Sequence, residues 1–144
     1  MTAQKIHLAK IKEHLQELKD AIAIGIENRP ATIGFHTSAC AIDLLELYLH
    51  KKDMIPIGTQ IKHEWFKRPK IGQKIIPLAE RHIAFDFEYK KEIIELMYTI
   101  EEKRNSLIYG NVTIGDIRQT YAAFEKLYQI LRERLGEELE DANN

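Results

Sequence analysis

Arg104 is the residue whose type and position most clearly suggest chemistry in this sequence. It falls on a helical face whose other members, Ile93, Met97 and Leu107, are apolar, and an arginine is seldom buried without a partner. Its guanidinium stays charged at neutral pH and donates two parallel hydrogen bonds to a phosphate. The position therefore predicts either a phosphate-binding arginine or one that pairs with an acid. The candidate acids are Glu27, Asp43 and Asp116.

The residues that follow Arg104 could complete a site for a phosphodiester. Cleavage of RNA without a metal needs a base for the 2′-hydroxyl proton, an acid for the leaving 5′-oxygen and a cation for the transition state. Arg104 has the chemistry of the cation, and Asn105 and Tyr109 could orient the phosphate or the 2′-hydroxyl. A tyrosine titrates near about 10 and is a poor base at neutral pH, so the base must come from elsewhere.

A second candidate segment interleaves basic side chains with aromatic rings. Residues 62–74 carry five basic residues against one acid, a local net charge of +4. Cations contact phosphates and exposed rings stack on unpaired bases, so the segment predicts a surface that follows an RNA strand. The alternative is a short lid helix whose rings cover the core while its lysines stay solvated. The candidate RNA contacts are Trp65, Lys67, Arg68 and Lys70.

Other catalytic patterns are weak or absent. No Glu-x-x-His pair, the usual source of metal ligands in helical bundles, occurs in the chain. His36, Cys40 and Asp43 share one helical face, but no second helix is expected to complete a site there. We therefore predict no cofactor and no metal centre, with a metal on that triplet as the third-ranked alternative. His7 and His14 share a face of the first helix and are expected to border solvent.

Length and composition bound the class of protein. The chain has 144 residues, of which 44% are hydrophobic and 30% charged, enough for one domain with its own core. Its single cysteine, Cys40, cannot form an intramolecular disulfide, and no apolar run approaches the roughly 20 residues that cross a bilayer. We expect a cytoplasmic protein without a membrane partner.

The net charge of −1 hides an asymmetry along the chain. Residues 137–141 carry four acids and no base, so the rest of the chain has a net charge of +3. That modest excess is compatible with a salt-sensitive binder of RNA. We assign residues 1–136 to one helical domain and residues 137–144 to an acidic, disordered tail.

Apolar residues recur at helical spacing through most of the chain, which predicts an all-α protein. A short helix at 59–67 is expected inside the irregular connection 53–82. Gly110 is expected to end the third long helix in a left-handed conformation, and Thr113 to cap the fourth. The predicted long helices cover 3–24, 30–52, a segment from between 86 and 92 to 109, and 113–135.

Four long helices with mostly short connections favour an antiparallel up-and-down four-helix bundle. In that topology the start of the second helix and the end of the third share one pole. His36 is the histidine that this arrangement places near Arg104, so it is our candidate base. The alternative is a hydrogen-bonded structural histidine near the start of a helix.

The segment that begins at Arg104 resembles the HEPN family (higher eukaryotes and prokaryotes nucleotide-binding domains). Its members carry an Arg, usually a polar residue after it, and a His four to six residues from the Arg, at the end of their third long helix. Arg104 and Asn105 match the first two elements, whereas Tyr109 stands in place of the His and Asn111 in place of a Tyr that some members add. Residues 35–43, with small side chains and a central acid, are similar to the family's second helix.

The resemblance implies an HEPN-like bundle that binds RNA or a nucleotide around Arg104, with Asn111 among the RNA contacts. Members with the complete motif are metal-independent endoribonucleases of toxin–antitoxin type, which also suggests a homodimer and a nucleotidyltransferase antitoxin as partners. A second apolar strip on the third helix, of Ile94, Tyr98 and Ile108, supports dimerisation. The alternative is a non-catalytic helical interaction module, either a nucleotidyltransferase partner or a dimeric scaffold, in which a carboxylate would lock Arg104.

Overall fold

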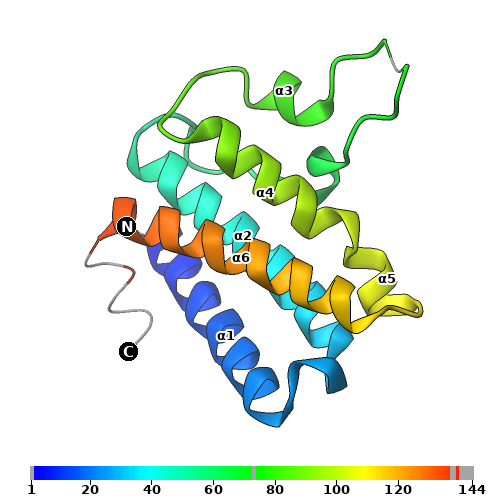
Figure 1. Cartoon of the computed structure of the whole chain (residues 1–144). Helices are drawn as coiled ribbons and strands as arrows, with labels where there is room; N and C mark the ends of the chain where they lie inside the picture. The colour runs from blue at the N-terminus through cyan, green and yellow to red at the C-terminus, as the bar shows by residue number, and fades with distance from the viewer. Residues whose placement is uncertain (1, 73, 137–138, 140–144) are drawn as a thin grey trace.

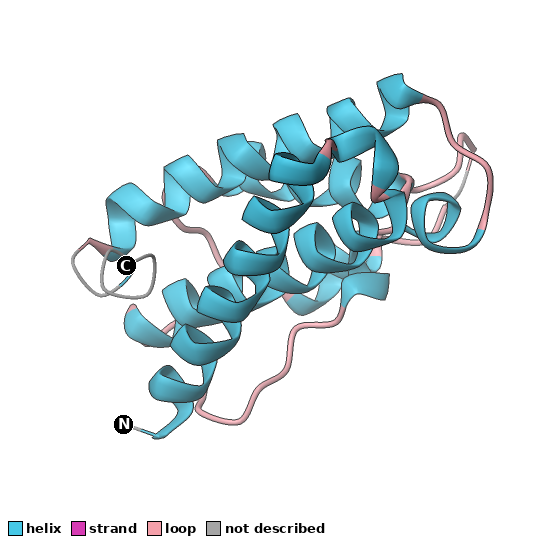
Figure 2. Cartoon of the chain, turned by 90° about the horizontal axis from the view of Figure 1, so that it is seen from below, coloured by secondary structure: helices cyan, strands magenta, loops and turns pink. Residues whose placement is uncertain are grey.

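The computed structural model describes residues 2–72, 74–136 and 139, and over these residues it contains helices and loops only (Figures 1 and 2). The all-α prediction is therefore confirmed. The long helices are α1 (Thr2–Ile24), α2 (Pro30–Lys51), α4 (Lys90–Glu102) and α6 (Ile114–Leu135). The short ones are η1 (Ile26–Asn28), η2 (His63–Phe66), α3 (Leu78–His82) and α5 (Arg104–Tyr109).

The central helix is α2, which packs against α1, α4, α5 and α6 (Figure 1). Every residue from 43 to 50 is buried as a result. The apolar stripe predicted for this helix is correct at Leu45 and Leu49, which are fully buried, but wrong at Phe35, which is 45% exposed. A single stripe is a poor description of a helix with neighbours on several sides. Because α2 is enclosed, its polar side chains are buried with it.

The third predicted helix is two helices. The backbone leaves the α-helical region at Lys103 (φ −106°, ψ 1°), so α4 ends at Glu102 and α5 begins at Arg104. The apolar face of α4 is as predicted, with Ile93 and Met97 buried. The break separates Arg104 from that face, which explains how an arginine follows three apolar turns without entering the core.

A glycine allows α5 to approach α2 closely. A Cβ atom on Gly34 would lie 2.7 Å from the Cβ of Leu107 and 3.3 Å from the carbonyl oxygen of Arg104. Cβ atoms do not approach non-bonded atoms this closely, so a side chain at this position would force α5 and α2 to shift apart. The start of α5, and with it Arg104, is therefore fixed against the first turns of α2.

The helix-end predictions had mixed outcomes. Thr113 and Asp116 form the predicted capping box at the start of α6. Gly110 does follow the end of α5, but in an extended conformation (φ −125°, ψ −166°), so the predicted left-handed stop is wrong. Gly136 ends α6 with a positive φ of 69°.

The connection between α2 and α4 is irregular, as predicted, and arches over the outer side of α4 (Figure 1). The helix expected at 59–67 is reduced to the single turn η2, and α3 was not predicted at all. Closely spaced proline and glycine residues between 56 and 77 prevent longer helices here.

The predicted acidic tail lies outside the described residues except for Leu139, whose side chain is fully buried. Among the described helices, none combines the length and apolar character needed to cross a membrane. Tyr98, assigned above to an apolar strip for dimerisation, is only 8% exposed, and Ile94 and Ile108 are half-buried. The chain itself therefore covers most of that strip.

Candidate functional site

A cleft of about 880 Å³ runs between α1, α2 and the chain segment 58–64, with Arg104 on its border. Four of the six histidines of the chain line it: His7, His14, His50 and His63. Lysines and carboxylates line it as well, so both signs of charge are present. A concave site that combines imidazoles, carboxylates and a guanidinium has the groups that acid–base catalysis, phosphate binding or metal binding usually requires.

Arg104 is half-buried and forms no ion pair within 4.0 Å with a described carboxylate, although its charge acts on Glu101, where it opposes the burial that raises the pKa of that carboxyl. Its Nη1 donates a hydrogen bond to the side-chain oxygen of Asn105 at 3.3 Å. Its Nε is buried and has no hydrogen-bond partner in the described part of the chain. Two of the acids suggested as partners are engaged elsewhere: Asp116 caps α6, and Asp43 contacts histidines. The guanidinium therefore keeps most of its donors for a ligand.

His14 and His36 form a hydrogen-bonded pair, Nδ1 to Nδ1, at 2.8 Å. One ring must donate its N–H and the other must accept with a lone pair, so at least one of the two imidazoles is neutral. Burial, together with the neighbouring His14, lowers the pKa of His36. Neutral imidazole at physiological pH is the form that accepts a proton.

The pair places His14, not His36, in the cleft. His14 is only 8% exposed, so the expectation that it borders solvent is wrong. The candidate base His36 therefore does not line the cleft itself, but its hydrogen-bond partner His14 does. The contacting ring belongs to α1, which faces α2 along this side.

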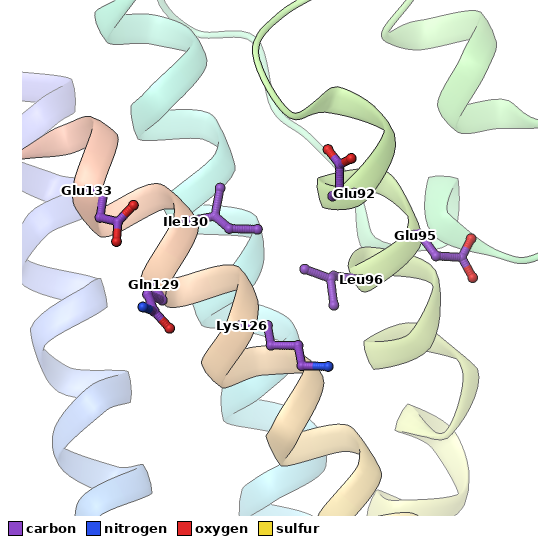
Figure 3. Close-up of a pocket in the computed structure, with 7 residues that line it drawn as sticks. All are labelled: Glu92, Glu95, Leu96, Lys126, Gln129, Ile130 and Glu133. Atoms are coloured by element: carbon purple, nitrogen blue, oxygen red, sulfur yellow. The ribbon is translucent and has the colours of Figure 1, made fainter.

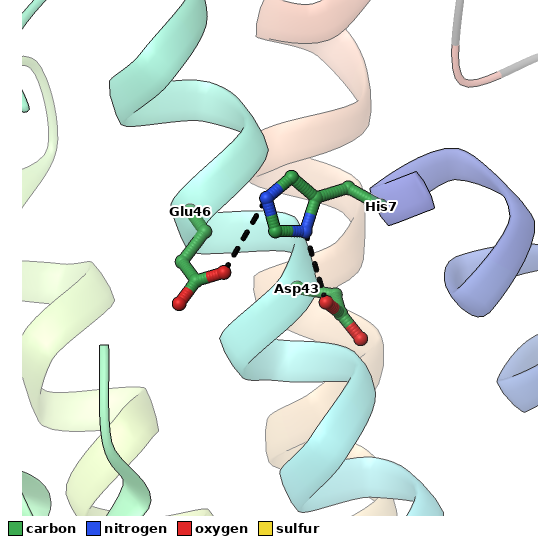
Figure 4. A group of neighbouring side chains, drawn as sticks. All are labelled: His7, Asp43 and Glu46. Atoms are coloured by element: carbon green, nitrogen blue, oxygen red, sulfur yellow. Dashed lines mark hydrogen bonds and ion pairs between the residues drawn. The ribbon is translucent and has the colours of Figure 1, made fainter. Parts of the chain in front are cut away.

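His7, Asp43 and Glu46 form a second cluster, in which the imidazole lies between the two carboxylates (Figure 4). His7 Nδ1 is 3.0 Å from Asp43 Oδ1, and His7 Nε2 is 3.4 Å from Glu46 Oε2. The amide N–H of Ile61 donates to Glu46 Oε1 at 2.6 Å. His14 Nε2 lies 3.6 Å from Asp43 Oδ2, which connects this cluster to the histidine pair.

The two carboxylates of the cluster differ in their acidity. Burial alone would raise the pKa of Asp43, but its interactions with His14 and His7 outweigh burial and lower it. Burial dominates at Glu46 and raises its pKa, although the amide of Ile61 and His7 act in the opposite direction. The pKa values of these two acids, which lie three residues apart on α2, are thus shifted in opposite directions.

Comparisons with known proteins do not assign the cleft. No family model, no curated protein and no solved structure matches this chain. What the cleft can do is therefore argued from its own side chains.

The other residues proposed around Arg104 do not line the cleft. Asn105 and Asn111 are exposed, and Tyr109 is 82% exposed at the end of α5. Of these three residues, Asn105 contacts Arg104 through the hydrogen bond described above. Of the four residues proposed as the catalytic group, the structure brings only Arg104 and, through His14, His36 to the cleft.

The basic and aromatic segment lies over a separate hollow of about 680 Å³, which shares only Glu64 with the cleft. Arg68 is paired with Glu95 at 2.7 Å and lies over the ring of Tyr98 at 5.4 Å. Trp65 stacks on His82, with ring centroids 4.2 Å apart. These contacts favour the lid interpretation for Trp65 and Arg68. Lys67 and Lys70 lie on the exposed border of this hollow.

The metal triplet considered from sequence, His36, Cys40 and Asp43, does not form a site. Cys40 is fully buried, and burial together with Asp43 raises the pKa of its thiol well above the ordinary value. A thiol in that environment resists the deprotonation that metal binding requires. Cys40 is a core residue of α2.

A further hollow of about 440 Å³ lies between α4 and α6 and shares no residue with the histidine-lined cleft (Figure 3). Leu96 and Ile130 form its floor, and glutamates from both helices surround it. Carboxylates at the rim disfavour a phosphate ligand by charge repulsion. This hollow contains no histidine and is not a candidate for the chemistry above.

The sequence analysis missed His7, His14, Glu46 and His50 as site residues. A signal for them was present in their spacing. His7 and His14 are seven residues apart on α1, and Asp43, Glu46 and His50 follow at intervals of three and four on α2. A pattern of ligand pairs within one helix does not reveal a site of this kind, because its ligands come from two helices and each helix contributes a row of polar side chains.

Proposed function

We propose that the chain binds the phosphate group of RNA or of a nucleotide in this cleft, with Arg104 as the phosphate ligand. The observation that carries the proposal is the state of Arg104: it lies on the border of the cleft, pairs with no described carboxylate and has a buried, unsatisfied Nε. A buried donor without a partner is costly, and phosphate oxygens are the acceptors that match a guanidinium best.

The HEPN resemblance belongs to the same proposal. In it, α1, α2, α4 with α5, and α6 correspond to the four helices of an HEPN-like bundle, and Arg104 to the motif arginine. Metal-independent cleavage of RNA is the activity that the resemblance implies. For that reaction His14, held by His36, takes the role of base that the sequence analysis gave to His36, because the imidazole of His14 lies in the cleft.

The alternative interaction module would have Arg104 locked by a carboxylate. No such ion pair is present among the residues that the structure describes, which favours the ligand-binding proposal. A homodimer and a nucleotidyltransferase partner remain part of the proposal through the resemblance alone.

The test is the binding of a short, fluorescently labelled single-stranded RNA, followed by anisotropy, with unlabelled AMP and ATP as competitors. We expect Arg104→Gln to weaken binding by about tenfold or more, since one charge-assisted contact to phosphate is lost. Arg68→Gln is the matched control, because Arg68 is engaged by Glu95 at the other hollow. Equal affinity of Arg104→Gln and the parent chain would refute the proposal.

Competition separates the two sources of phosphate. If AMP or ATP displaces the RNA at concentrations close to the dissociation constant of the RNA, the ligand is a nucleotide. If only longer RNA competes, the ligand is a strand. A parallel incubation of the RNA with chelator present tests cleavage, which should be lost in His14→Gln and in Arg104→Gln.

A further inference from the structure

The cluster of His7, Asp43 and Glu46, which lines the cleft, has the composition of a metal site. One ligand-type atom from each of His7, Asp43 and Glu46 lies within 4.8 Å of the other two, and no other group of three does so among the described residues. Imidazole nitrogen together with carboxylate oxygen suits divalent first-row transition ions such as Zn²⁺ and Mn²⁺. The ligands come from α1 and α2, which are packed directly against each other.

Both carboxylates are held in place by groups behind them. The amide of Ile61 fixes one oxygen of Glu46 and leaves Oε2 facing His7. His14 lies beside one oxygen of Asp43, and the other oxygen faces His7. Outer contacts of this kind orient metal ligands and contribute to affinity. The three side chains are therefore preorganised rather than loosely gathered.

The two carboxylates of the cluster are buried and have imidazoles as their ion-pair partners. Asp43 and Glu46 are 8% and 7% exposed, and the cationic groups that contact them among the described residues are imidazoles, which are charged only when protonated. Burying carboxylates without full compensation is costly. A divalent cation would balance both charges at once. His7 now offers one ring nitrogen to each carboxylate, so the ring or a carboxylate must rotate before one nitrogen and both carboxylates lie about 2.0–2.2 Å from a zinc ion.

His50 provides a second, independent observation. It follows Glu46 by one helical turn, lines the same cleft and stacks on His7 with ring centroids 5.7 Å apart. His50 is only 8% exposed, yet its Nδ1 has no hydrogen-bond partner among the residues that the structure describes. A buried imidazole nitrogen is rarely left unsatisfied in a native protein. A metal ion, or a water bound to it, would satisfy this atom.

We propose that His7, Asp43 and Glu46 bind one divalent transition-metal ion in the cleft, with His50 reaching the ion through a bound water. This inference goes beyond the proposed phosphate binding and does not depend on it. Arg104 borders the cleft but is not a ligand of the ion.

Calorimetric titration of the chelator-treated chain with Zn²⁺, and separately with Mn²⁺, tests the proposal. We expect one equivalent of at least one of the two ions to bind, with an increase in the thermal unfolding temperature, because an ion that binds only the folded state stabilises it. His7→Gln and Glu46→Gln should each weaken binding by about tenfold or more. Co²⁺ in place of Zn²⁺ should give visible absorption bands that both variants lose.

His63→Gln is the matched control. His63 lines the same cleft and also contacts two carboxylates, Glu101 at 3.0 Å and Glu64 at 3.1 Å, but lies outside the cluster. The His63→Gln variant should bind the ion with the same affinity as the parent chain, and so should Arg104→Gln. Far-UV circular dichroism of each metal-free variant shows whether it is folded, and His7, which is half-buried near the start of α1, is the substitution least disruptive to the core.

Two outcomes would overturn the proposal. One is a folded parent chain that binds neither ion. The other is equal binding by the parent chain and by folded His7→Gln and Glu46→Gln, which would place the ion elsewhere. Failure of RNA binding would leave these measurements unaffected, so the two proposals fail separately.

Discussion

Gly34 on α2 and Leu107 on α5 are so close that a methyl group on the glycine would lie 2.7 Å from the Cβ of the leucine. This contact fixes the helix that begins with Arg104. The geometry of the proposed phosphate ligand thus depends on a residue without a side chain, on a different helix.

Replacing Gly34 by Ala should destabilise the fold by about 1–3 kcal/mol, the usual cost of overpacking a tight contact. It should also weaken RNA binding, since α5 must move away from α2 and takes Arg104 with it. Urea unfolding and the anisotropy assay measure the two effects. Gly115→Ala is the control, because its Cβ would meet only Thr113 Oγ1, at 3.5 Å. Unchanged stability of Gly34→Ala would show that α5 is not held as described.

The histidine pair predicts a pH dependence of stability. The pKa of His36 is lowered in the folded state, so below its ordinary value of 6.5 the unfolded chain binds more protons. Stability should therefore fall as the pH decreases from about 7.5 to 5.5. In His36→Gln the fall should be smaller, as judged from urea midpoints across that range. Identical slopes for both proteins would contradict the lowered pKa. Asp43, whose pKa is also lowered, loses its contribution only at pH values below its ordinary 3.8.

Loss of the capping box should be measurable at the start of α6. Thr113→Ala removes the acceptor for the amide of Asp116 and should cost about 1 kcal/mol in the free energy of unfolding. Thr99 is the matched control, because its hydroxyl only bonds back to the carbonyl of Glu95 within α4. Thr99→Ala should change stability by less than about 0.5 kcal/mol. Equal losses in both variants would argue against the cap.

The thiol of Cys40 should be unreactive in the folded protein. It is fully buried and its pKa is raised, so neither access nor thiolate is available. Alkylation by iodoacetamide at pH 8 should proceed only in urea, and mass spectrometry follows the single adduct. Rapid labelling of the native chain would show that α2 opens locally around this residue.

Local features of the fold were predictable from sequence, and features that depend on tertiary packing were not. Thr113 caps α6 because its partner is three residues away, and the apolar face of α4 follows from helical periodicity. The break at Lys103 has no comparable local signal. The exposure of Phe35 could not be predicted, because it depends on which sides of α2 the other helices occupy.

The same distinction explains the site. Arg104 could be singled out because one charged residue interrupts an apolar pattern. The cluster of His7, Asp43 and Glu46 could not, because it forms only when α1 and α2 pack at one particular alignment. Neither helix carries a complete set of ligands by itself.

The contacts from His36 through His14, Asp43 and His7 to Glu46 connect residues 7–14 of α1 with residues 36–46 of α2. Leucine and isoleucine surfaces tolerate sliding, since one apolar side chain can replace another. A slide of one turn, about 5.4 Å, would separate each of these polar groups from its partner inside a low-dielectric interface. The polar row therefore sets the register of the two helices, a specificity that the surrounding apolar core does not provide.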